Sequence, residues 1–166
     1  MSGKTYNVLF LCNSDTARGI IAEAVLNRDG GGRFHAFSAG IHAGETLNED
    51  VAAMLKKLNY DTASLRPKGV EEFTSAGAPR MHFVFTLCDS VAGDAMPALP
   101  GKPMTAHWSV PDPAAIAEQG AERGLKIAEI FRMLDRRIGV FCHLRLDALD
   151  RLALQTQLDQ IGEQEH

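Results

Sequence analysis

Residues 8–19 read VLFLCNSDTARG and are followed by a helical pattern in residues 20–27, IIAEAVLN. The apolar run is typical of a buried strand, and it ends at Cys12. Five residues separate this cysteine from Arg18, which lies two residues before the helical pattern begins. A loop that leads into a helix N-terminus directs backbone N–H groups and the positive end of the helix dipole toward its centre. The stretch therefore predicts an oxyanion-binding loop with a thiol beside it.

The thiol and the guanidinium in this loop suit nucleophilic chemistry on an anion. The field of the loop favours the thiolate, which is the reactive form of a cysteine. A guanidinium such as that of Arg18 can bind two oxygens of a tetrahedral anion at once. The same spacing also arises by chance, with Cys12 as a core residue and Arg18 as a surface charge. Its position between a strand and a helix favours the anion site.

Composition limits the class of protein. The chain has 166 residues, of which 45% are hydrophobic and 23% charged, which suits one globular domain spanning 1–166. The net charge of -4 argues against nucleic acid as a partner. Without an apolar run of membrane-spanning length or a signal-peptide segment, we expect a cytoplasmic protein with no membrane partner. Cys12, Cys88 and Cys142 lie far apart in sequence, so we expect no disulfide framework and no bound metal.

Strand-like and helical segments alternate along the chain. This order predicts an α/β fold, a three-layer αβα sandwich with a small, four-stranded, doubly wound parallel sheet. Asn48 and Asp147 are the predicted N-caps of two helices. The expected strands are 8–12, 33–40, 82–87 and 104–108, and the expected helices are 20–27, 49–58, 69–73, 118–142 and 147–161.

Three chemically capable side chains follow expected strands. Ligands of such folds bind beyond the carboxyl ends of the strands, where Cys12, Cys88 and the turn of Asp112 should meet. Alternatively, Cys88 is a core cysteine at the end of a strand with no chemical role, and Asp112 is only the turn residue that Pro111 and Pro113 require. We expect Cys142 to serve only in packing and Lys68 to be a solvated loop charge.

At this point the sequence resembles the low-molecular-weight protein tyrosine phosphatase family, and most closely its arsenate reductase branch. The resemblance covers essentially the whole chain. It rests on VLFLCNSDTARGIIAEAVLN, on FSAG, on FVFTLCDSVAGDAMPALPGKPMTAHWSVPDPA and on LRLDALDRLALQTQLDQIG. The block around Cys88 is specific to the reductase branch, because a simple phosphatase would not need it.

The resemblance implies a role for each matching residue. Cys12 is then the nucleophile, and Asp112 is the general acid that protonates the leaving oxygen. Cys88 attacks the arsenate adduct on Cys12, which releases arsenite and leaves a disulfide. No cofactor is bound, and glutathione with glutaredoxin, or thioredoxin, serves as the external thiol donor. We expect a monomer or weak dimer. The oxyanion-binding loop comprises Asn13, Ser14, Asp15, Thr16, Ala17 and Arg18.

The chain departs from the family pattern at three positions. Asp15 stands where the family has asparagine, and Gly19 stands where it has a hydroxyl that stabilises the thiolate. Met96 replaces a further cysteine of the reductase branch. Three functions therefore remain open: an arsenate reductase, a phosphatase acting on phosphomonoesters through Cys12, and an oxyanion-binding or regulatory relative with impaired catalysis.

Overall fold

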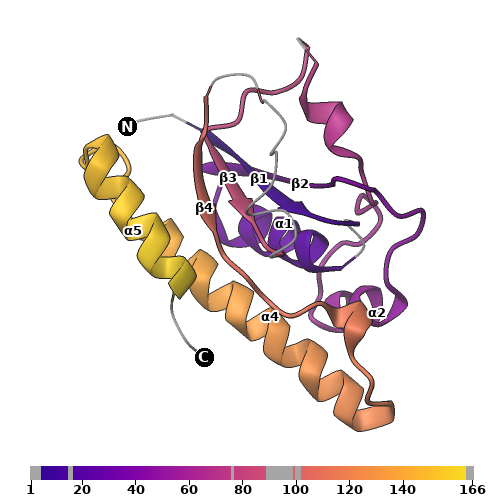
Figure 1. Ribbon diagram of the computed structural model, residues 1–166. Helices are drawn as coiled ribbons and strands as arrows, with labels where there is room; N and C mark the ends of the chain where they lie inside the picture. The colour runs from indigo at the N-terminus through magenta and orange to yellow at the C-terminus, as the bar shows by residue number, and fades with distance from the viewer. Residues whose placement is uncertain (1–4, 15–16, 76, 89–98, 100–101, 164–166) are drawn as a thin grey trace.

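Strand β1 (Tyr6–Cys12) lies between two other strands of a four-stranded sheet in the computed structural model (Figure 1). The structure describes residues 5–14, 17–75, 77–88, 99 and 102–163. The strand order is β2-β1-β3-β4, with β2 at Phe34–Gly40, β3 at Phe83–Thr86 and β4 at Met104–His107. All three pairings are parallel. The predicted α/β fold with a four-stranded parallel sheet is confirmed.

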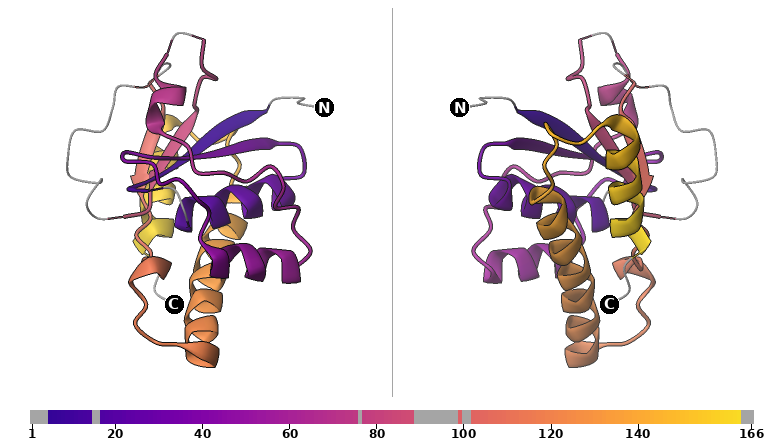
Figure 2. Two further views of the ribbon diagram at one scale, coloured as in Figure 1. Left: turned by 90° about the vertical axis from the view of Figure 1, so that its right-hand side faces the viewer. Right: turned by 90° about the vertical axis from the view of Figure 1, so that its left-hand side faces the viewer.

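The helices follow the strands in the expected order. Helix α1 packs against β1 and β2, α5 packs against β4, and α4 contacts both α1 and α5 (Figure 2). The two short 3₁₀ helices η1 and η2 precede β3 and follow β4. The bounds are Arg18–Asp29 for α1, Glu49–Lys57 for α2, Gly120–Cys142 for α4, Arg151–Glu163 for α5, Val70–Phe73 for η1 and Pro113–Ala115 for η2.

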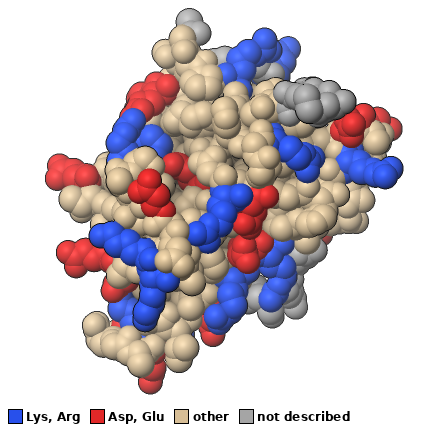
Figure 3. All heavy atoms as spheres, turned by 180° about the vertical axis from the view of Figure 1, so that it is seen from behind, with Lys and Arg blue, Asp and Glu red and all other residues tan. Residues whose placement is uncertain are grey.

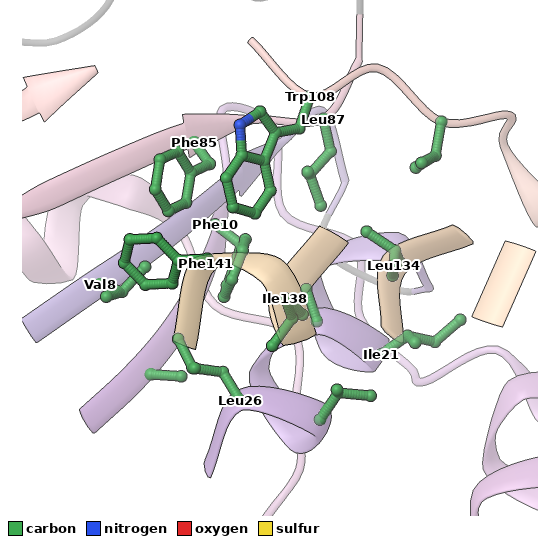
Figure 4. Close-up of a cluster of buried hydrophobic side chains, with 14 of the residues drawn as sticks. Val8, Phe10, Ile21, Leu26, Phe85, Leu87, Trp108, Leu134, Ile138 and Phe141 are labelled. Carbon is green, nitrogen blue, oxygen red and sulfur yellow. The ribbon is translucent and has the colours of Figure 1, made fainter. Parts of the chain in front are cut away.

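Alternation along the strands divides the core into two clusters. Phe10 and Cys12 belong to the larger cluster, which α1, α4 and α5 complete. Leu11 points to the opposite face, where η1 and Cys88 form the smaller cluster. In the larger cluster, Phe85 stacks on Trp108 at 3.8 Å between ring centroids, and both rings contact Phe141 (Figure 4). Burial of these aromatic rings fixes the chain beyond β4 against the sheet.

Some helix details differ from the sequence prediction. The N-cap at Asn48 is confirmed, because its side chain accepts hydrogen bonds from two N–H groups of α2. The predicted N-cap at Asp147 is wrong: α5 begins at Arg151, and the Asp150 carboxylate accepts from the Ala153 N–H at 2.7 Å. The leucine pattern of this segment predicts an apolar stripe that includes Leu152, but Leu152 is 78% exposed. It lies two residues before the buried Leu154 and therefore on the opposite face of the helix.

Lys68 is buried, contrary to the prediction of a solvated loop charge. Its ammonium lies 3.2 Å from Glu23 Oε1 and donates to the Arg66 carbonyl at 2.8 Å and to Ser38 Oγ at 3.4 Å. Ser38 Oγ in turn donates to Glu23 at 2.7 Å. The Lys68 carbonyl also accepts from the N–H of Gly40, the last residue of β2. This charged cluster joins α1, β2 and the segment before η1.

Substituting Lys68→Met should lower the free energy of unfolding by about 3 kcal/mol, because it leaves the Glu23 carboxylate without its buried counter-charge. Urea denaturation measures this change. Lys57→Met, at an exposed position of α2, is the matched control and should change stability by less than about 0.5 kcal/mol. Equal effects of the two substitutions would show that the Lys68 cluster contributes no stability.

Three further observations concern what the protein could bind: the hydropathy of its helices, its metal-ligating side chains and its surface charge. Within the described ranges, no helix is long and apolar enough to cross a bilayer. The same residues hold no group of three or more His, Cys, Asp or Glu side chains arranged for a metal ion. The face seen in Figure 3 carries basic and acidic side chains interspersed rather than a continuous area of one sign.

Candidate functional site

The candidate site begins where β1 ends. Cys12 is the last residue of this strand and is 2% exposed. Its carbonyl accepts from the N–H of Ile41, and the carbonyls of Asn13 and Ser14 accept from His42 and Gly44 at 2.8 Å each. Carbonyl oxygens repel anions, and here three consecutive ones are bound to the neighbouring 41–44 segment. This arrangement fixes the described part of the loop and suits an anion beside it.

Helix α1 provides the other side of the loop. Its N-cap is Ala17, whose side chain has no polar atom to accept from the first N–H groups, and its first turn contains no acidic residue. The terminal N–H groups of a helix need partners from outside it, and they favour negative charge. The sequence thus leaves this helix end suited to an external oxyanion.

Arg18 connects the loop to the turn of Asp112. One guanidinium nitrogen of Arg18 donates to the Val110 carbonyl at 3.0 Å, and the other lies 3.7 Å from Asp112 Oδ2. The Arg18 side chain is 12% exposed and that of Asp112 is 43% exposed. The Asp112 carboxyl is thus reached by solvent and is still held near the loop by a nearly buried guanidinium. The Arg18–Asp112 contact brings the turn of Asp112 beside the end of the segment that starts at Cys12.

The turn reaches this position because the chain continues alongside β3 after β4 ends. The Trp108 N–H donates to the Thr86 carbonyl at 2.7 Å, and the Val110 N–H donates to that of Leu87 at 3.1 Å. Leu87 itself donates to the Leu11 carbonyl at 3.0 Å. These bonds place the residues before Asp112 beside the carboxyl ends of β1 and β3, as expected for a ligand site in a parallel sheet.

Cys88 lies at the same edge of the sheet as Cys12 but on its other side. The β1–β3 register pairs Leu11 with Thr86, so Cys88 comes one residue beyond the point opposite Cys12. Cys12 packs in the larger hydrophobic cluster and Cys88, 5% exposed, in the smaller one. Both are thiols here. The sheet edge thus brings the two cysteines to neighbouring strand ends without directing them at each other.

A groove of about 670 Å³ extends from Pro111 and Asp112 along α4. Its described lining includes Asp112 but neither Cys12 nor Arg18. The groove therefore adjoins the turn rather than forming the anion loop itself. Apolar side chains of Ile116, Ile130 and Met133 and basic side chains of Lys126, Arg132 and Arg136 line it.

Other expectations concern residues at or near this edge. Asp15 and Thr16 of the predicted loop, and Met96, lie outside the described residues. Gly19 is buried in the first turn of α1. Cys142 is half-buried at the end of α4, and burial raises the pKa of its thiol to about 11, which suits the packing role expected of it.

Sequence reasoning did not single out Arg137. It is 4% exposed, and its guanidinium donates to the Ser109 carbonyl at 2.8 Å. Burial lowers its pKa from the ordinary value. A signal was present in the sequence, because Arg137 lies three residues after Leu134 and directly before Ile138, two apolar residues of the helix expected at 118–142.

Comparison with known proteins places the chain in a family. Residues 7–151 match the profile of the low molecular weight phosphotyrosine protein phosphatases. The chain belongs to this family. The resemblance drawn from the sequence is thereby confirmed.

Relatives within the family include arsenate reductases. An arsenate reductase of Halalkalibacterium halodurans is 25% identical over 134 residues, which cover 81% of this chain and 93% of that protein. The crystal structure of an arsenate reductase from Archaeoglobus fulgidus is 26% identical with a TM-score of 0.60 and covers 80% of this chain and 98% of its own. These relatives support the predicted arsenate reductase branch and an enzyme of this type.

A third relative shares the fold. The thioredoxin-dependent arsenate reductase of Corynebacterium glutamicum has a TM-score of 0.59 at 22% identity. The match covers 84% of this chain and 61% of that one.

Proposed function

We propose that this member of the phosphatase family reduces arsenate to arsenite in the cytoplasm by thiol chemistry. The observation that carries the proposal is the meeting of four groups at one sheet edge: Cys12 and Cys88 at neighbouring strand ends, and Arg18 paired with Asp112 beside them. The named activity of the relatives from H. halodurans and A. fulgidus supports it.

In the first step, the Cys12 thiolate attacks arsenic(V) of arsenate held by the loop and Arg18. A sulfur–arsenic bond forms and an arsenic–oxygen bond breaks. The departing oxygen leaves as water after it accepts the proton of Asp112. Arg18 and the α1 N-terminus stabilise the oxyanion during this step.

In the second step, the Cys88 thiolate attacks the sulfur of Cys12. A disulfide forms and the sulfur–arsenic bond breaks with its electron pair moving to arsenic, which leaves as arsenite. Two thiols are oxidised and arsenic(V) is reduced by two electrons. Because the two cysteines pack on opposite sides of the sheet, Cys88 must leave the smaller cluster to attack. An external thiol donor, such as thioredoxin or glutathione with glutaredoxin, then reduces the disulfide.

The test is arsenite production by the purified chain. Arsenate is supplied with thioredoxin, thioredoxin reductase and NADPH, or with glutathione, glutaredoxin and glutathione reductase, and arsenite is measured by chromatography coupled to arsenic detection. We expect repeated turnover with one of the two donors. Absence of turnover with either donor would contradict the proposal and favour the impaired relative.

A phosphatase acting on phosphomonoesters is the second candidate. It is favoured by the separation of the thiols, since Arg18 and Asp112 are already paired near Cys12 while Cys88 lies across the sheet. Hydrolysis through a phosphoenzyme at Cys12 needs no other thiol. Release of phosphate from p-nitrophenyl phosphate without a thiol donor measures this activity in parallel.

A further inference from the structure

The turn that carries Asp112 has few backbone donors of its own. Pro111 and Pro113 flank the aspartate, and proline has no N–H to donate. The described hydrogen bonds after Asp112 are local ones, such as the Ala115 N–H to the Asp112 carbonyl at 3.0 Å. The position of the turn therefore depends on contacts made by the residues just before it, together with the Arg18–Asp112 ion pair.

Two arginines bind consecutive carbonyls at this point. Arg137 of α4 donates to the Ser109 carbonyl at 2.8 Å, and Arg18 of α1 donates to the Val110 carbonyl at 3.0 Å. They reach the turn from different helices. The carbonyls lie three and two residues before Asp112, so the two bonds together restrain both the position and the direction of the chain entering the turn.

Arg18 and Arg137 differ in the other interactions that the proposed reaction asks of them. Arg18 lies at the anion loop, and in the proposed reaction its guanidinium binds the oxyanion as well as the turn. Arg137 is nearly fully buried in α4, and a buried guanidinium is costly unless its hydrogen bonds compensate. The hydrogen bond from Arg137 to the Ser109 carbonyl involves no group of the anion loop. Arg137 can thus hold the turn while Arg18 engages a substrate.

We propose that Arg137 is a positioning residue for the general acid: its bond to the Ser109 carbonyl holds the turn so that Asp112 is aimed at the leaving oxygen. This inference rests on the proposed roles of Cys12 and Asp112. The acid's contribution to the rate is largest when the leaving group is poor, because a good leaving group departs without a proton. Loss of Arg137 should therefore act selectively.

The kinetic test compares two aryl phosphates on the full chain. Arg137→Met should lower kcat for phenyl phosphate about 10- to 100-fold, as Asp112→Asn does, but lower kcat for p-nitrophenyl phosphate less than about threefold. KM should change less than about twofold for both. Arg137→Lys keeps the charge and one donor and should recover part of the loss. Arg145→Met, at an exposed position after α4 and outside the groove that Asp112 lines, is the control and should change neither substrate's kcat.

Hydrogen exchange provides a readout that needs no turnover. Arg137→Met should accelerate exchange of the Val110 and Ala115 amides at least about tenfold while leaving β1 amides unchanged. Equal loss of kcat on both phosphates, or unchanged exchange in the turn, would overturn the proposal. If the wild type hydrolyses neither phosphate, the phosphatase activity is absent, and the exchange measurement alone decides the role of Arg137.

Discussion

Replacing Cys12 with serine should abolish both arsenite production and phosphomonoester hydrolysis, each by at least about 10⁴-fold. Both proposed reactions begin with attack by the Cys12 thiolate. A serine hydroxyl in the same loop is not ionised near neutral pH and is a much weaker nucleophile than a thiolate. Steady-state rates of arsenite and phosphate release measure the loss.

The fold should survive this substitution, since serine and cysteine have nearly the same shape. Cys142→Ser is the matched control, because Cys142 lies half-buried at the end of α4 with its thiol pKa raised to about 11. It should keep activity within about twofold of the wild type. If Cys12→Ser retained more than about 1% of either activity, another group would have to be the nucleophile.

Replacing Cys88 with serine should separate the two activities. Arsenite production should fall at least about 10³-fold, because attack on the adduct then depends on an external thiol at millimolar concentration instead of an intramolecular one of far higher effective concentration. Hydrolysis of p-nitrophenyl phosphate should stay within about threefold, since it needs Cys12, Arg18 and Asp112 alone.

Mass spectrometry of the Cys88→Ser variant provides a second reading of this prediction. After incubation with arsenate the wild type should form a Cys12–Cys88 disulfide, whereas the Cys12 of the variant should not be oxidised to an intramolecular disulfide with Cys142 or to any other disulfide within the chain. Unchanged arsenite production by Cys88→Ser would show that the external donor attacks Cys12 directly. Cys88 would then be the core residue that its place in the smaller cluster resembles.

Sequence reasoning predicted the parts of the fold that follow from local pattern. The apolar run before Cys12, the helix after Arg18 and the cap at Asn48 all depend on residues close together in the chain, and each is present. The strand order brought Asp112 to the same edge as Cys12, because parallel strands end on one side of a sheet.

The features that sequence reasoning missed depend on contacts between segments that are distant in the chain. Lys68 is buried because Glu23 and Ser38, from α1 and β2, surround its ammonium. Arg137 is tolerated in the core because the carbonyl of Ser109 lies within its reach. A charged residue in isolation predicts exposure, so neither burial follows from the local sequence.

The structure was also needed to show that the thiols of Cys12 and Cys88 lie on opposite sides of the sheet. Side chains alternate along a strand with period two, which fixes the side of Cys12 within β1, whereas Cys88 lies two residues beyond the end of β3. The β1–β3 register, in which Leu11 lies opposite Thr86, and the packing of Cys88 in the smaller cluster show which side Cys88 takes relative to Cys12. The proposed attack of Cys88 on Cys12 is therefore also a prediction that the Cys88 segment moves during the reaction.

The most direct test is a single turnover of the reduced wild-type chain with arsenate in the absence of any thiol donor. Arsenite, remaining thiols and disulfide-linked peptides are measured on the same sample. Our account predicts about one arsenite released per chain, with two thiols lost together and a disulfide joining Cys12 to Cys88. Bound arsenate that yields no arsenite, or arsenite released without a Cys12–Cys88 disulfide, would contradict it.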